Sequence, residues 1–149
     1  MKTLFFASLI AITAAVPGMA LAQDASPVGL WQNIDDATGK PKALIRITEN
    51  KGEVRGQIEK LFLTAGDNPN PRCDKCQGAN KDQPVLGMVF MSGLRKNGEA
   101  YSGGEILDPV SGKVYRSKLT LVDGGKKVMV RGYVGVPLLG HSQTWVRQD

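Results

Sequence analysis

From Gly29 onward the chain is a series of short β-prone runs, each ended by turn residues, and this pattern constrains the fold most. In KALIRITE, residues 42–49, apolar and polar side chains alternate, which is typical of a strand with one buried face. Asn50-Lys51-Gly52 then supplies a tight turn into the next alternating run, so the two runs predict a hairpin. No later stretch has the apolar period of a helix.

The same pattern continues to the end of the chain and predicts about eight strands. They are expected over residues 29–33, 42–49, 53–63, 85–94, 100–107, 113–122, 126–134 and 143–147. Sequential antiparallel strands in one domain are best accommodated by an up-and-down barrel, because closure leaves no unpaired edge. An open sandwich is the alternative. The predicted fold class is therefore all-β, with a barrel as the expected architecture.

The N-terminal residues have the pattern of an export signal. Lys2 is followed by an apolar run from Leu4 to Val16 and then by Ala20-Leu21-Ala22. We expect residues 1–22 to be a signal peptide cleaved after Ala22, and residues 23–149 to form a single β-barrel domain in the periplasm or outside the cell. The apolar run is short for a membrane span, and no later segment approaches that length, so no transmembrane segment is expected.

The charge pattern limits the partners. The formal net charge is +5, and the basic residues are scattered rather than gathered into one run. An exported protein of this kind is not expected to bind nucleic acid. Anionic glycans or lipid headgroups are the electrostatic partners that this charge favours. A solvated surface without a charged partner is the alternative.

The segment RCDKCQG holds the only two cysteines, Cys73 and Cys76. In an exported chain a disulfide is the expected state, and it would restrain the long loop around it. A redox pair would call for a helix N-terminus, and zinc would call for about four ligands, whereas the chain offers only His141 besides the thiols. A c-type haem is excluded because Gln77 stands where histidine is needed. We therefore expect a structural disulfide, no metal and no cofactor.

The sequence proposes no catalytic group. His141 is the only histidine, and its neighbour Ser142 would point to the opposite face of a strand. Glu105 and Asp108 lie three residues apart, so a regular strand places them on opposite faces. We therefore expect a protein without enzymatic activity.

Two motifs at the ends of the predicted sheet suggest how it closes. Gly29-Leu30-Trp31 resembles the G-x-W motif of lipocalins, and Trp145-x-Arg147 resembles their terminal arginine, which packs over that tryptophan. A guanidinium stacked on Trp31 would join the first strand to the last. Two independent core tryptophans are the alternative.

Longer phrases extend this resemblance over the chain from Gly29 onward. KCQGANKDQPVLGM (75–88), GGEILDPVSGKVY (103–115) and VRGYVGVPLLGHSQTWVR (130–147) are similar to those of the bacterial exported family called domain of unknown function 2147. This resemblance implies a small lipocalin-like barrel and no established biochemical activity. His141 stands where members of the family often have arginine.

The barrel interior is the expected binding site. By alternation Tyr101 shares a face with Glu105, and with Trp31 and Tyr115 they are predicted to line a cavity for a small, partly apolar or lipid-like ligand. Alternatively, Glu105 faces solvent and the aromatic side chains fill the core. The protein would then be a non-enzymatic envelope module that contacts another envelope component, such as a protein, a glycan or a membrane surface.

Overall fold

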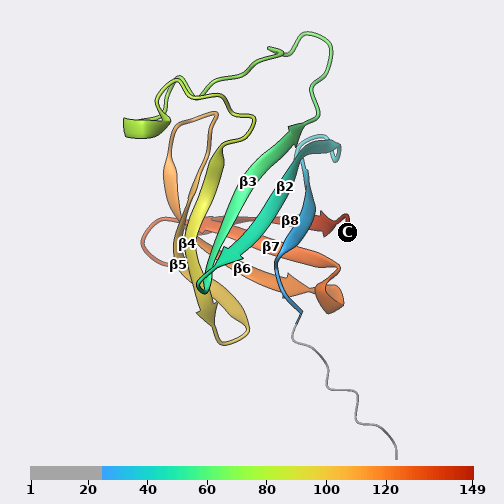
Figure 1. Ribbon diagram of the computed structural model, residues 1–149, viewed down its shortest axis with the longest axis vertical. Helices are drawn as coiled ribbons and strands as arrows, with labels where there is room; N and C mark the ends of the chain where they lie inside the picture. Colours follow the sequence, from blue (N-terminus) through green and yellow to red (C-terminus); the bar gives the residue numbers. More distant parts are fainter. Residues whose placement is uncertain (1–24) are drawn as a thin grey trace, which may run out of the picture.

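The computed structural model describes residues 25–149, so the predicted signal peptide and the Ala22 cleavage site lie outside the described residues. Eight antiparallel strands pair in sequence order, and β8 returns to β1 to close a barrel (Figure 1). The strands are β1 Gly29–Ile34, β2 Pro41–Asn50, β3 Glu53–Leu61, β4 Val89–Asn97, β5 Ala100–Leu107, β6 Val114–Val122, β7 Lys127–Tyr133 and β8 Gly140–Arg147. Two short 3-10 turns, η1 Gly78–Asn80 and η2 Asp123–Gly125, are the only helical segments in the described part. The predicted all-β up-and-down barrel is confirmed.

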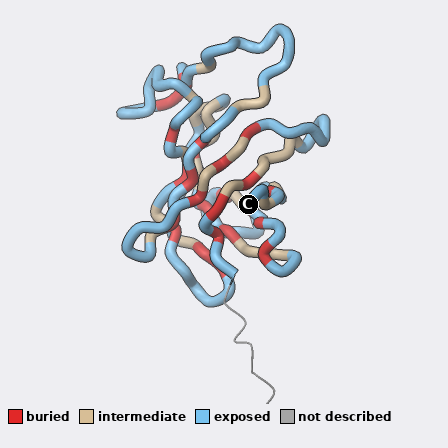
Figure 2. Tube along the Cα trace, turned by 45° about the vertical axis from the view of Figure 1, so that its right-hand side comes forward, coloured by how far each residue is buried: buried red, intermediate tan, exposed pale blue. Residues whose placement is uncertain are grey.

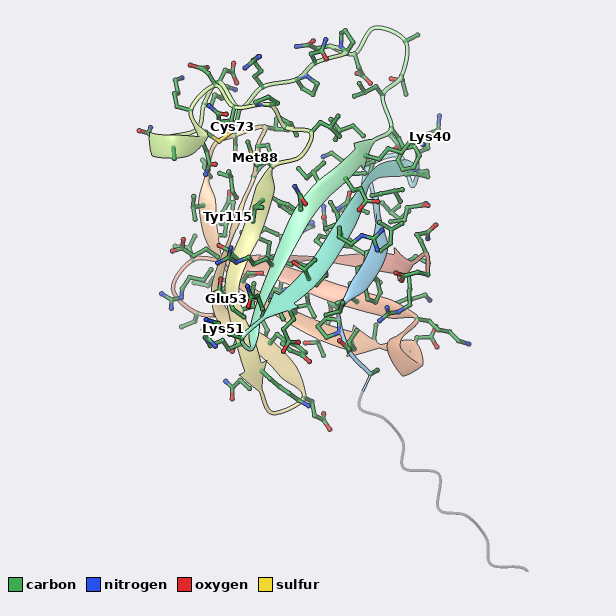
Figure 3. All side chains as sticks on the ribbon, in the orientation of Figure 1. Lys40, Lys51, Glu53, Cys73, Met88 and Tyr115 are labelled. Carbon is green, nitrogen blue, oxygen red and sulfur yellow. A yellow bond between two sulfur atoms is a disulfide. The ribbon has the colours of Figure 1, made fainter. Side chains whose placement is uncertain are left out.

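The two ends of the barrel differ in their connections. Tight turns join β2 to β3, β4 to β5 and β6 to β7 at one end, which we call the closed end. The opposite, open end carries the other four connections, including the long loop 62–88 between β3 and β4. In Figure 3, Lys51 and Glu53 mark the closed end, whereas Cys73 and Met88 lie at the open end. Local turn chemistry therefore forms the closed end, and longer segments surround the open end.

The half of the interior near the closed end is filled. Trp31, Val54, Leu94, Leu119 and Val128 are completely buried there and belong to one apolar cluster. Buried positions recur along the strands, while most residues of the turns and loops are exposed (Figure 2). Each such side chain contributes roughly 1.5–3 kcal/mol by leaving water. This packed half forms the base of the barrel interior, and the remaining interior lies between it and the open end.

The seam between β1 and β8 is short and depends on Arg147. Only Trp31–Arg147 and Gln32–Val146 pair across it. The Arg147 guanidinium carbon lies 4.2 Å from the centroid of the Trp31 ring. Its nitrogens donate to the carbonyls of Gly125 (2.8 Å), Val28 (3.0 Å) and Ser26 (2.6 Å). The Arg147 side chain thus connects β8 to the indole of Trp31 on β1, to the residues before β1 and to the β6–β7 turn.

The glycine of the G-x-W motif makes room for this arginine. A Cβ on Gly29 would lie 2.5 Å from Arg147 Nη1, and the Gly29 φ of +150° is one that side-chain-bearing residues rarely adopt. The Trp31 indole is held in turn by donating from Nε1 to the Pro27 carbonyl at 2.8 Å. The close approach of Arg147 therefore explains why a glycine stands two residues before Trp31.

A bulge in β5 changes which residues of this strand point into the barrel, and it overturns the predicted position of Glu105. The β5–β6 register shifts between Tyr101 and Gly104, and Gly103 has a φ of +82°. Tyr101 and Gly104 are therefore both buried, whereas Glu105 is exposed. The expectation that Glu105 shares the interior with Tyr101 was wrong, because simple alternation does not hold across the bulge.

The long loop 62–88 is anchored by a small core of its own. The predicted Cys73–Cys76 disulfide is confirmed, and both cysteines are buried together with Met88 and Leu107. The Cys73 sulfur lies 3.2 Å from the Pro109 carbonyl oxygen in the β5–β6 connection. Figure 3 shows Cys73 and Met88 together at the open end of the barrel. The loop is thus packed onto the neighbouring connection.

The loop also differs from the predicted strand boundaries. A strand was expected from residue 85, but β4 begins at Val89. Gly87 has a φ of +84°, and Met88 N donates to the Val85 carbonyl at 3.2 Å, so residues 85–88 form a turn. This turn carries Met88 into the disulfide cluster.

Replacing both cysteines with alanine is expected to lower the free energy of unfolding by about 2 kcal/mol, because the closed loop no longer restricts the unfolded chain. Denaturant unfolding of wild type and of Cys73→Ala/Cys76→Ala would measure this. Dithiothreitol should destabilise wild type by a similar amount and leave the double variant unchanged. Equal stability of the oxidised wild type and the variant would contradict the anchoring role.

Candidate ligand-binding cavity

A cavity of about 920 Å³ occupies the open-end half of the barrel. It lies above the packed half, and its lining comes from strands, from the loop 62–88 and from the connections β5–β6 and β7–β8. Small-molecule sites in proteins usually measure roughly 300–1,000 Å³. The barrel therefore has room for one small ligand.

Most of the wall of this cavity is apolar. It is formed by aliphatic and aromatic side chains that point inward from neighbouring strands, namely Ala43, Ile45, Ile58, Leu61, Phe90, Ile106 and Trp145. Phe90 and Trp145 contact each other, with ring centroids 6.1 Å apart. Phe90 also packs against the disulfide cluster, so the cavity wall and the anchored loop share a side chain. Such a wall favours a ligand with an apolar body.

A polar strip interrupts the wall where β1 meets β8. Asn33 Nδ2 donates to Gln143 Oε1 at 2.9 Å, and the Trp145 indole donates to the same oxygen at 3.4 Å. Asn33 Oδ1 is buried and has no hydrogen-bond partner among the described residues. Because a buried polar atom usually has a partner, this oxygen is an acceptor that the protein itself leaves unused.

The strip continues to the rim through Asp36. Its carboxylate Oδ2 lies 2.9 Å from His141 Nε2 and accepts from Gln143 Nε2 at 3.0 Å. The hydrogen bonds from His141 and Gln143 hold the pKa of the Asp36 carboxyl below its ordinary value. The β1–β2 connection is thereby attached to β8 beside the cavity. His141 is a partner of Asp36 at the rim rather than a lone side chain.

Charges of both signs surround the mouth. The lining includes the cations Lys42, Arg72 and Lys75 and the carboxylates Asp67, Asp74 and Asp108. Asp108 accepts from Ser111 Oγ at 2.6 Å within the β5–β6 connection. Within residues 25–149 no group of histidine, cysteine, aspartate and glutamate side chains has the arrangement of a metal site. The rim therefore selects neither anions nor cations strongly.

The four residues predicted to line the cavity have different positions. Tyr115 lies in the lining on β6. Trp31 and Tyr101 are buried in the packed cluster below it, where they form part of the base. Glu105 is exposed on the outer face of β5. Trp31 and Arg147, predicted to close the barrel, contact each other across the seam.

Several lining residues were missed by the sequence reasoning. Gln143 follows from the alternation of β8, because it shares a face with Trp145 and Arg147. Asn33 follows in the same way from Trp31. Phe90 and Ile106 do not follow from alternation, because the strand registers shift beside them. The β3–β4 register shifts between the pairs Gly56–Met91 and Gln57–Val89, and the β5–β6 register shifts between Tyr101 and Gly104.

A closed eight-stranded up-and-down barrel, with a packed base and a cavity at one end, is a lipocalin-like fold. A family of uncharacterized proteins conserved in bacteria, DUF2147, matches residues 29–147, and the chain belongs to this family. The match extends from the first residue of β1 to the last residue of β8. The family resemblance read from the sequence is confirmed.

One solved structure shows the same architecture. Protein HP1028 from Helicobacter pylori, described as belonging to the lipocalin family, superposes with a TM-score of 0.70 at 17% sequence identity, over 84% of each chain. At this identity the likeness establishes the fold. No curated protein sequence matches the chain significantly. Among residues 25–149 no helix has the length and apolar character needed to span a membrane.

Proposed function

We propose that the protein binds and carries a small, partly apolar molecule in the cavity of its barrel. The observation that supports this most is the cavity itself, about 920 Å³ in volume, with an apolar wall and one polar strip. A barrel that served only as a rigid module would be more stable if side chains filled this space. The alternative of an envelope module with a filled core is therefore not favoured.

The lining indicates the chemistry of the ligand. Aliphatic and aromatic side chains would contact an apolar body, and Gln143 and Asn33 would contact a polar group near the β1–β8 seam. The unused acceptor Asn33 Oδ1 favours a ligand group that donates a hydrogen bond, such as a hydroxyl or an amide. A lipid-like molecule or an envelope metabolite with one hydroxyl or amide would fit this description.

The proposal includes no catalytic step, no cofactor and no nucleic acid. The protein is proposed to be located in the periplasm or the extracellular space, because residues 1–22 have the pattern of a signal peptide. The Cys73–Cys76 disulfide is consistent with an oxidising compartment. The role proposed here is therefore that of an exported binding protein.

Native mass spectrometry of protein purified from the periplasm tests this proposal. We expect a species heavier than the polypeptide, and we expect the extra mass to be lost on denaturation. A titration with the apolar fluorophore N-phenyl-1-naphthylamine should give saturable fluorescence enhancement that the released ligand reverses. A native mass equal to that of the bare chain, together with no saturable enhancement, would refute the carrier role.

A further inference from the structure

The loop that joins β7 to β8, residues 134–139, exposes an unusual number of aliphatic side chains. The exposed fractions are 64% for Val134, 54% for Val136, 85% for Leu138 and 70% for Leu139. The loop joins the end of β7 to the start of β8, on the left of the view in Figure 1. Contiguous apolar surface of this kind usually marks a site of interaction. We call these residues the apolar tip.

The apolar tip is held in one conformation by Arg131. From β7, this guanidinium donates to the carbonyls of Pro137, Leu138 (3.2 Å) and Gly140 (3.1 Å) and to Ser142 Oγ (2.7 Å). Within the loop, Val136 N donates to Val134 O and Leu139 N donates to Val136 O, both at 3.0 Å. These backbone carbonyls of the tip already accept hydrogen bonds from the protein. The tip can therefore enter an apolar environment without leaving them unpaired.

Cations lie behind the apolar tip on the outer wall. Lys118 on β6 is directly opposite Arg131 on β7, and Arg116 is opposite Tyr133. Arg116 and Lys118 are exposed, and the exposed Glu105 on β5 is the cross-strand neighbour of Arg116. Even so, neither cation forms an ion pair with a carboxylate of residues 25–149. Like charges on facing positions of two strands repel each other. An apolar tip with adjacent unpaired cations is the combination that binds anionic lipid surfaces.

We propose that the apolar tip docks on an anionic lipid bilayer. Val136 and Leu138 enter the boundary between headgroups and acyl chains, and Arg116 and Lys118 face the lipid phosphates. The tip contains aliphatic residues only, whereas protein interfaces depend on tryptophan, tyrosine and arginine anchors. This composition favours lipid over a protein partner.

Docking would place the cavity mouth on the membrane. Val134 and Leu139 belong both to the apolar tip and to the cavity lining. A partly apolar ligand could then pass between the bilayer and the cavity without crossing water. This consequence rests on the proposed carrier function, whereas the lipid contact itself does not depend on it.

Co-sedimentation with vesicles tests the docking. The exported protein should bind vesicles of phosphatidylethanolamine and phosphatidylglycerol, and Val136→Asp/Leu138→Asp should weaken binding by roughly tenfold or more. Neither residue lines the cavity, so N-phenyl-1-naphthylamine binding should be unchanged. Val146→Asp, an exposed aliphatic position on the outer face of β8, is the matched control and should bind vesicles like wild type.

A second pair of changes tests the charges. Arg116→Gln/Lys118→Gln should weaken binding to phosphatidylglycerol vesicles and reduce its salt dependence, with little effect on pure phosphatidylcholine vesicles. Wild type that fails to sediment with phosphatidylglycerol vesicles, or a tip variant that binds as well as wild type, would overturn the proposal. So would a wild-type dimer that the tip variant converts to monomers in sedimentation velocity, because the tip would then be a self-association surface. A native mass equal to that of the bare chain, together with no saturable fluorophore binding to wild type, would refute the carrier function and leave the vesicle result standing.

Discussion

Arg147→Ala should lower the free energy of unfolding by about 3 kcal/mol and the melting temperature by about 10 °C. The variant loses the stacking on Trp31 and leaves three backbone carbonyls, those of Gly125, Val28 and Ser26, without their donor. It also weakens a seam that has only two paired positions. Thermal and denaturant unfolding of the purified protein would measure both quantities.

Arg46→Ala is the matched control for this prediction. Arg46 forms ion pairs with Glu59 at 2.8 Å and with Asp149 at 3.4 Å, but both carboxylates are exposed and Arg46 is itself partly exposed. Because water screens exposed pairs, the loss should stay below about 1 kcal/mol. Arg147→Lys should recover only part of the stability, because an ammonium cannot reproduce the planar fork. Equal losses for Arg147→Ala and Arg46→Ala would show that the clasp does not stabilise the barrel.

Ile106→Trp should weaken binding of N-phenyl-1-naphthylamine, and of any copurified ligand, by at least about tenfold. Ile106 lines the cavity from β5 and approaches Gly132 on β7. The larger indole would occupy space that the ligand needs, and it would add apolar burial rather than create a void. The melting temperature should therefore change little while affinity falls.

The adjacent residue on the same strand provides the control. Glu105 is exposed on the outer face of β5, so Glu105→Trp adds the same side chain one position away and should leave binding unchanged. This pair also tests the position of the β5 bulge. If Glu105→Trp blocked binding and Ile106→Trp did not, the ligand would not occupy the proposed cavity.

Much of the fold could be predicted from short-range patterns. Alternation in residues 42–49 and the turn at Asn50-Lys51-Gly52 placed β2 and β3, because both signals depend only on neighbours in the chain. The cysteine pair could be predicted for a similar reason, since the two residues are close in sequence and have no other cysteine to pair with. Gln143 and Asn33, on the same faces as Trp145 and Trp31, were also accessible to this reasoning.

The rest of the site depended on contacts between distant segments. Glu105 was misplaced because Gly104 approaches the backbone of Ser92 and Gly93 on β4, and the strand accommodates this approach with a bulge. Met88 and the disulfide reach the β5–β6 connection through packing that no local pattern encodes. The same holds for Arg131 and the carbonyls of the β7–β8 loop.

The sequence by itself determined the strands, the turns at the closed end and the residues available for the clasp, since each is governed by the conformational preferences of a few adjacent residues. Only the tertiary structure decided which interior positions form the packed base and which line the cavity. Bulges shift the inward face by one residue, and their positions are set by how closely neighbouring strands approach. The cavity is therefore a property of the closed barrel and cannot be assigned to any single segment of the chain.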